Sequence, residues 1–287
     1  MRTLKATLVL MFLPILPTGD ASAQLPLDER RPASEDGTVK ITSAVGSVRV
    51  VGWDQDSVAI TGTLGQGAER LDFSTNERET RIRVLLPKDA HEVGSSDLEV
   101  RVPHGSHVAV RTSSADIEIA EVNGALDLES VSGGIRVSGR PRMLYAESAG
   151  GDVEVDVQTK VVRAKSVGGN VTVRRAIGYV EVSTVSGDAF VEGRSIWEGE
   201  VTSVAGSIHF EGDFDSGGSF YFESHSGTIE LLLPSHIAAD FDVTTMSGGQ
   251  VENDFAPSRE RTFSTGGGGT QIKIKSFKGV IRILEQS

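Results

Sequence analysis

Hydrophobic and polar residues alternate along most of this chain, and between Thr112 and Val191 the alternation is organised by a recurring phrase of eight positions. The phrase reads Ser or Thr, two variable residues, Gly, a turn-forming residue, and then apolar, variable, apolar. Its fourth position falls on residues spaced 18 apart: Ala115, Gly133, Gly151, Gly169 and Gly187. A fixed period of this kind is typical of a solenoid, in which each repeat forms one coil.

Each 18-residue unit contains two predicted strands. In the unit around Gly151, Val153 and Val155 flank Glu154, and the second half of the unit alternates in the same way. A period of two places one set of side chains inside and the other in solvent. Because the same pattern returns at every period instead of reversing as in hairpins, we expect an all-β fold, a right-handed single-stranded parallel β-helix (β-solenoid) with coils of about 18 residues.

The hydroxyl residue that opens each phrase is predicted to face inward beside the Gly turn. A buried hydroxyl requires a hydrogen-bond partner, so we expect a ladder in which these groups bond to one another or to turn amides. The predicted column consists of Ser130, Ser148, Ser166, Thr184, Ser203, Ser224 and Thr245. Beyond Gly187 the period lengthens, and Phe210, Phe222 and Phe241 are predicted to fill the wider interior.

The pattern also predicts the domain organisation. Residues 1–23 combine Arg2 and Lys5 with an apolar run and a closing Ala21-Ser-Ala23, the order of a secretory signal peptide. Residues 24–36 are polar and aperiodic, and we expect a flexible leader there. The remainder, 37–287, is predicted to be one β-solenoid domain. It divides into irregular N-terminal coils (37–111), regular repeats (112–251) and a C-terminal cap (252–287), although 37–111 could instead form a separate small β domain.

The composition of the chain excludes some classes of binding partner. The net charge of -12 argues against nucleic acid or anionic lipid as a partner, because both require a basic face. There is no Cys, so disulfides contribute nothing. No apolar run after the predicted signal peptide has the length of a transmembrane helix.

Two groups of residues are candidates for metal binding. Asp116, Asp152, Asn170 and Asp188 share one column and could bind Ca²⁺, but turn chemistry is the interpretation we favour, because the chain lacks the dense Gly/Asp repeat of calcium-binding solenoids. His104 and His107 have no acidic or Cys partner at metal-site spacing, and we expect a solvated turn. The chain is therefore predicted to hold no metal and no cofactor.

Six outward-facing residues form the predicted ligand-binding patch: Tyr145, Arg163, Glu181, Phe190, His209 and Tyr221. Exposed aromatic rings beside charged groups are suited to stacking on sugar rings or to a protein partner. No residue is predicted to be catalytic, because the outer carboxylates lie on alternating, solvated faces that do not shift a pKa. The alternative is a polysaccharide-active lyase or hydrolase, which a cleft with three or more unsatisfied charged side chains would favour.

The chain resembles a known family in three of its features. These are the Ser-x-x-Gly-Asp/Asn-Val-x-Val repeats, the lead-in from Leu98 to Thr112 (LEVRVPHGSHVAVRT) and the closing run from Ile272 to Ile283 (IKIKSFKGVIRI). They are similar to the bacterial β-strand-repeat domains of unknown function that are named "putative adhesin". The resemblance implies a β-helix in an exported bacterial protein and supplies no site residues.

Taken together, these patterns predict an exported, non-enzymatic β-solenoid, an adhesin-like binding or scaffold module of the bacterial cell envelope. Its predicted location is the periplasm or the cell surface. A glycan or an envelope protein is the expected partner, and the ligand and the oligomeric state are left open.

Overall fold

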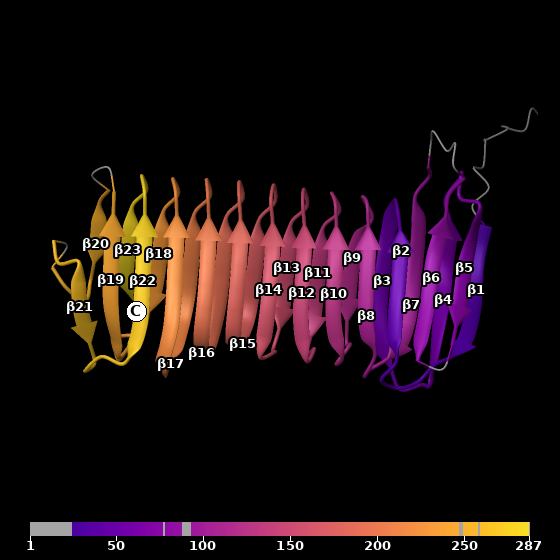
Figure 1. Ribbon diagram of the computed structural model, residues 1–287, viewed down its shortest axis with the longest axis horizontal. Coiled ribbons are helices and arrows are strands. Elements are labelled where there is room, and N and C mark those ends of the chain that lie inside the picture. The colour runs from indigo at the N-terminus through magenta and orange to yellow at the C-terminus, as the bar shows by residue number, and fades with distance from the viewer. Residues whose placement is uncertain (1–24, 77, 88–92, 247–248, 258, 287) are drawn as a thin grey trace, which may run out of the picture.

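The computed structural model describes residues 25–76, 78–87, 93–246, 249–257 and 259–286. All regular structure in these residues is β-strand, wound into a solenoid whose coils stack along one long axis (Figure 1). Each regular coil contributes one strand to each of two sheet faces, which we call face A and face B. The all-β, solenoid-like prediction is thus confirmed. The predicted signal peptide, residues 1–23, lies outside the described residues.

Face A contains, in spatial order, β1 (Leu25–Pro32), β4 (Ser57–Leu64), β7 (Ser96–Pro103), β3 (Gly46–Trp53), β9 (Asp116–Ala120), β11 (Ile135–Gly139), β13 (Val153–Val157), the first halves of β15 (Val171–Thr184), β16 (Ala189–Ser203) and β17 (Ile208–Ser224), then β18 (Ile229–Leu233), β23 (Ile281–Glu285) and β20 (Val251–Asn253).

Face B contains β5 (Arg70–Thr75), β6 (Glu79–Leu85), β2 (Thr38–Ser43), β8 (His107–Thr112), β10 (Ala125–Ser130), β12 (Met143–Ser148), β14 (Val161–Ser166), the second halves of β15, β16 and β17, then β22 (Thr270–Ser276), β19 (Ala239–Thr245) and β21 (Thr262–Thr265). The Ser-x-x-Gly turns join face B to face A along one edge, which we call the turn edge. The return from face A to face B forms the opposite edge.

The regular coils pair in register. On face B, Leu126 pairs with Leu144, Leu144 with Val162 and Val162 with Val180, each step being 18 residues. All four side chains are almost fully buried. Since identical positions of successive coils stack on one another, a core of small aliphatic residues continues through the molecule.

The predicted hydroxyl ladder is present beside the turn edge. Ser148 Oγ accepts a hydrogen bond from the Gly151 N–H (2.9 Å) and donates one to the carbonyl of Gly133 in the preceding coil (3.0 Å). The same two bonds recur at Ser166 and at the later hydroxyls up to Ser224. Each hydroxyl therefore satisfies a turn amide and links two coils at once.

The wider coils are filled by aromatic side chains, as predicted. Phe210, Phe222 and Phe241 are fully buried, and Phe214 and Phe220 join the first two in a cluster of ring contacts. In these coils β15, β16 and β17 continue through the opposite edge without a break.

The prediction of a flexible leader is wrong for most of residues 24–36. Residues 25–32 form β1, which pairs antiparallel with β4 along its whole length. The Arg30 guanidinium lies 5.0 Å from the ring centre of Trp53, and that of Arg31 lies 5.5 Å from Phe73. The strand has no apolar alternation because it is mostly exposed, and Pro26 and Pro32 are tolerated at the edge of a sheet.

The predicted parallel winding does not continue to the two ends. Of the predicted C-terminal cap (252–287), β21 lies at the end of face B, whereas β22 and β23 lie inside the stack. The coil of β2 and β3 lies between those of β6/β7 and β8/β9, and β22/β23 lie between β17/β18 and β19/β20. Four pairs are antiparallel: β1–β4, β4–β7, β5–β6 and β19–β21. Antiparallel strands thus form three of the four sheet ends, β1, β5 and β21, and the fourth is the three-residue strand β20.

Candidate functional site

The predicted ligand-binding patch is divided between the two faces. Tyr145, Arg163, Glu181 and Tyr221 share one row of face B, in which Glu200 separates the last two. Phe190 and His209 are neighbours on face A. The six residues therefore do not form one surface. Alternation predicts whether a side chain points inward or outward, but the face on which it lies depends on which strand of the coil carries it.

The face B row is held together by its own contacts. Glu181 accepts the Tyr179 hydroxyl (3.1 Å) and forms ion pairs with Arg163 (3.0 Å) and Lys165 (2.5 Å). The Arg163 guanidinium also lies 5.3 Å from the ring centre of Tyr145. Burial and the Glu181 carboxylate raise the pKa of Tyr179. The paired charges of Arg163 and Glu181 link neighbouring coils in this row.

Glu181 gives the stability a pH dependence. Burial alone would raise its pKa, but the hydrogen bond and charge of Lys165, the Tyr179 hydroxyl and the Arg163 charge outweigh burial, and the pKa lies below 4.5. A lowered pKa stabilises the fold above about pH 4.5, and this contribution is lost as the pH falls through the folded-state value. We expect Glu181→Gln to cost about 1 kcal/mol at pH 7 and to flatten the fall in stability below about pH 4.5.

Urea unfolding at a series of pH values measures this effect. Glu154→Gln is the matched control, because Glu154 forms a more exposed pair with Arg136. A Glu181→Gln variant with the wild-type pH profile would show that the face B cluster contributes nothing to stability.

The two face A rings are stacked along the solenoid axis. Phe190 and His209 lie 4.9 Å apart with an interplanar angle of 7°, and the Arg174 guanidinium is 5.7 Å from the Phe190 centroid. His209 Nδ1 is 3.0 Å from Glu230 Oε1. His209 and Arg174 thus both contact the Phe190 ring on which a sugar was expected to stack.

The candidate metal ligands are engaged in turn contacts. Asp116 accepts the Gly134 N–H (2.8 Å), Asp152 the Asn170 N–H (2.7 Å) and Asn170 the Asp188 N–H (2.9 Å). His104 contacts the Glu121 carbonyl (2.6 Å) and Asp54 (3.4 Å). Among the described residues, no three His, Cys, Asp or Glu side chains are grouped as metal ligands.

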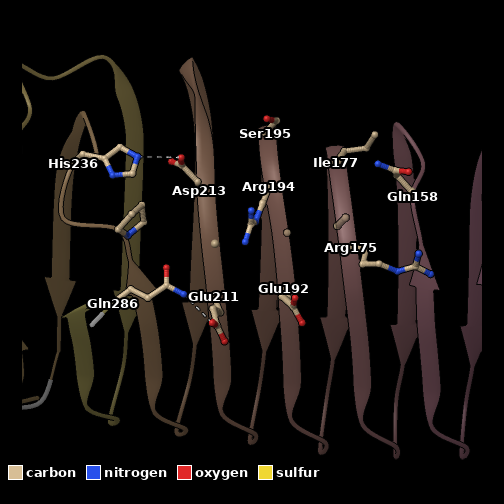
Figure 2. Close-up of a pocket in the computed structure, with 14 residues that line it drawn as sticks. Gln158, Arg175, Ile177, Glu192, Arg194, Ser195, Glu211, Asp213, His236 and Gln286 are labelled. Atoms are coloured by element: carbon tan, nitrogen blue, oxygen red, sulfur yellow. Dashed lines mark hydrogen bonds and ion pairs between the residues drawn. The ribbon is translucent and has the colours of Figure 1, made fainter.

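A pocket of about 600 Å³ lies at the opposite edge, where β15, β16 and β17 pass from face A to face B (Figure 2). Its volume is within the range of small-molecule sites. The lining residues are Gln158, Arg175, Ala176, Ile177, Glu192, Gly193, Arg194, Ser195, Glu211, Gly212, Asp213, Pro234, His236 and Gln286.

At the base of the pocket three neighbouring coils carry small residues at the same level. Ala176 pairs with Gly193, and Gly193 with Gly212. A Cβ atom on Gly212 would lie 1.9 Å from the Gly193 carbonyl oxygen, and one on Gly193 would lie 2.7 Å from the Ala176 oxygen. The coils approach so closely here that only glycine fits at these two positions, and the backbone itself lines this part of the pocket.

The backbone around this floor is irregular. The register shifts between Val173 and Ala176 and between Gly193 and Ile196. Arg175 and Ser195 have φ values of 56° and 53°, a left-handed conformation that costs a non-glycine residue about 1–3 kcal/mol. Strain of this kind persists where the surrounding structure maintains it, often at functional sites.

Polar side chains from distant segments form the walls. Gln286 Nε2 donates to Glu211 Oε1 (2.9 Å), which joins the end of the described chain to β17. His236 Nε2 lies 3.6 Å from Asp213 Oδ2, as Figure 2 shows. Within the described part of the chain, Glu192 and Arg194 make no side-chain hydrogen bond or ion pair.

This pocket was not predicted from the sequence. A signal was available in the lengthening of the period beyond Gly187 and in Gly193 and Gly212, which interrupt the alternation where the coils widen. Neither feature shows that Pro234, His236 and Gln286 close the same space, because these residues approach only through the stacking of coils.

Several solved structures resemble this one at low sequence identity. A putative adhesin from Bacteroides fragilis is 14% identical, with 92% of this chain and 98% of that chain covered and a TM-score of 0.47. A putative adhesin from Parabacteroides distasonis is 9% identical, covering 88% and 98% with a TM-score of 0.47. A putative lipid binding protein from the same species is 12% identical, covering 93% and 98% with a TM-score of 0.46.

Because the sequence identities and TM-scores are this low, the ligand has to be inferred from this chain's own residues. No curated protein matches the chain. The model of the Toastrack DUF4097 family, however, matches residues 32–283, from the last residue of β1 to β23. This match confirms the resemblance seen in the repeats, and the chain belongs to the Toastrack DUF4097 family.

Proposed function

We propose that this protein is a non-enzymatic binding module that holds a glycan in the pocket formed by β15, β16 and β17. The observation that carries the proposal is a pair of oppositely charged side chains, Glu192 and Arg194, that have no partner among the described residues and line a pocket of about 600 Å³.

The chemistry of the walls favours hydroxyl groups. Arg175 and Arg194 only donate hydrogen bonds, whereas Glu192, Glu211 and Asp213 only accept them when ionised. A hydroxyl does both, so neighbouring hydroxyls on a sugar can satisfy both kinds of group. A simple anion would meet three carboxylates and a simple cation two guanidinium groups, which disfavours either ion alone.

The same walls favour binding over catalysis. A general acid usually needs a carboxyl group withdrawn from water, and here Glu192 is exposed while Glu211 and Asp213 are partly exposed. In the part of the chain that the structure describes, Glu192 and Arg194 are the two charged lining side chains without a side-chain hydrogen bond or ion pair, fewer than the three expected of a catalytic cleft. A polysaccharide-active enzyme remains the alternative, and it is tested by the release of reducing ends.

Export to the cell envelope is part of the proposal and is supported by the order of charged, apolar and small residues in 1–23. In the described residues, no helix is long and apolar enough to cross a membrane. The right-handed winding stays a prediction from the usual handedness of crossover connections.

A glycan array probed with the chain lacking residues 1–23, followed by calorimetry on the best ligand, tests the proposal. We expect Arg194→Ala and Glu192→Ala each to weaken binding about 10- to 100-fold, because each leaves sugar hydroxyls without a partner. Arg163→Ala, on face B, is the control and should bind like the wild type. If all variants bound with equal affinity, the glycan site would not be this pocket. Release of reducing ends by the wild type would show that the protein is a polysaccharide-active enzyme.

A further inference from the structure

A row of exposed apolar side chains follows the turn edge, and we call it the turn ridge. Among the described residues, eight large hydrophobic side chains are exposed, and all but Leu25 and Trp197 lie in this row. Its members are Val131, Val167, Val185, Val204, Phe277 and Met246. Each follows the Ser or Thr that opens its phrase, so the ridge belongs to the repeat itself.

The coil-to-coil hydrogen bonds align these residues. The carbonyl of Val131 accepts the Gly150 N–H (2.8 Å), that of Val167 the Ser186 N–H (3.0 Å) and that of Val185 the Ala205 N–H (2.8 Å). The corresponding turns form a straight row beyond the arrowheads of the face B strands (Figure 1). Further along, the His225 ring stacks on Phe277 at 4.5 Å, which continues the row.

The ridge is also uncharged over seven consecutive coils. Its residue and the one that follows are Ala44-Val45, Ser113-Ser114, Val131-Ser132, Ala149-Gly150, Val167-Gly168, Val185-Ser186 and Val204-Ala205. Both faces of the same coils carry charged rows, and the chain has a net charge of -12. Single exposed apolar residues are ordinary, but a contiguous row marks an interaction surface.

We propose that the turn ridge is the surface through which two copies of this chain associate, edge against edge. Its side chains repeat at the coil spacing of about 4.8 Å. A partner that inserts a side chain between each two successive ridge residues must have side chains at the same spacing. The turn ridge of a second copy has this spacing. Stacked identical side chains that interdigitate in this way exclude water, and a two-fold axis makes the contact self-complementary.

The charge of the chain and the length of the ridge are both compatible with a second copy of the chain as the partner. Two acidic molecules approach with least repulsion along their uncharged edges, whereas an anionic membrane would repel the whole chain. From Val131 to Met246 the ridge is about 35 Å long at this spacing. A contact this narrow belongs with the small interfaces of weak complexes, which bury less than about 1,200 Å² in total. The dimer is therefore weak and depends on concentration.

Sedimentation velocity over a range of concentrations tests the proposal on the chain lacking residues 1–23. We expect the wild type to dimerise and Val167→Lys/Val185→Lys to remain monomeric. These two side chains are 51% and 41% exposed, so the core is not disturbed, and circular dichroism verifies the fold. Trp197→Lys/Ser216→Lys adds the same charge on the opposite edge and should dimerise like the wild type.

Cysteine substitution locates the contact, because the chain contains no Cys of its own. Val131→Cys, Val167→Cys, Val185→Cys and Val204→Cys are oxidised in turn, and we expect an intermolecular disulfide at the positions near the two-fold axis and none in Trp197→Cys. A wild type that stays monomeric, or a dimer that survives both lysines without a ridge disulfide, overturns the proposal. Co-sedimentation of monomers with phosphatidylcholine vesicles, lost in the lysine variant, would assign the ridge to lipid instead.

Discussion

Replacing Gly169 by Ala is expected to lower the free energy of unfolding by about 3 kcal/mol, at the upper end of what overpacking usually costs. A Cβ atom at this position would lie 2.3 Å from the carbonyl oxygen of Gly151 and 2.7 Å from the Asp152 nitrogen, both of them backbone atoms of the preceding coil. The coils cannot separate freely, because Ser166 bonds to both Gly169 and Gly151. The midpoint temperature of thermal unfolding should therefore fall by about 6–12 °C.

The adjacent glycine provides the control for this substitution. A Cβ on Gly168 would be 3.4 Å from its nearest neighbour, the Ala149 oxygen, and neither glycine has φ in the left-handed region. Gly168→Ala should therefore change stability by less than about 0.5 kcal/mol. If the two variants melted at the same temperature, close approach of the coils would not be the reason for the glycine column.

Phe222→Ala is expected to cost about 3–5 kcal/mol, the usual range for removing a buried aromatic ring. Phe222 is completely buried and contacts the rings of Phe210 and Phe220 in the widened coils. The floor residue Gly212 lies between Phe210 and Phe214, so loss of the ring should also loosen the pocket and weaken ligand binding. Denaturant unfolding measures the first effect and calorimetry the second.

Tyr221 provides the matched control, since it precedes Phe222 on the same strand but points outward. Tyr221→Ala removes a ring of similar size from a half-exposed position and should cost about 1 kcal/mol or less. Similar losses in the two variants would contradict the assignment of Phe222 to the inside and Tyr221 to the outside.

The regular coils were predictable from local pattern. Valines on either side of Glu154, repeated at a fixed period, indicated which side chains are buried, and they lie in register in the structure. The need of a buried hydroxyl for a partner likewise predicted the bonds of Ser148 and Ser166. These features depend on period-two alternation and on neighbouring coils with the same pattern, and both can be recognised in the sequence.

The candidate site was much less predictable. The six residues were predicted to form one exposed patch, but Tyr145, Arg163, Glu181 and Tyr221 lie in one row of face B, and the rings of Phe190 and His209 lie on the other face. The charges of Arg163 and Glu181 are paired with each other. The pocket depends on Gln286 meeting Glu211 and His236 meeting Asp213. Contacts between segments so far apart follow from the stacking order and leave no local pattern.

Alternation and an 18-residue period thus sufficed to establish strands, inner columns and parallel stacking, because each is decided by residues within a coil and its equivalent in the next. The order of the coils at the ends was decided only in three dimensions. Since every coil presents nearly the same aliphatic columns and the same hydroxyl, β22 and β23 can pair as well between two coils as beyond the last. The covering of exposed strand edges, β1 included, selects among these arrangements, and it depends on the whole stack.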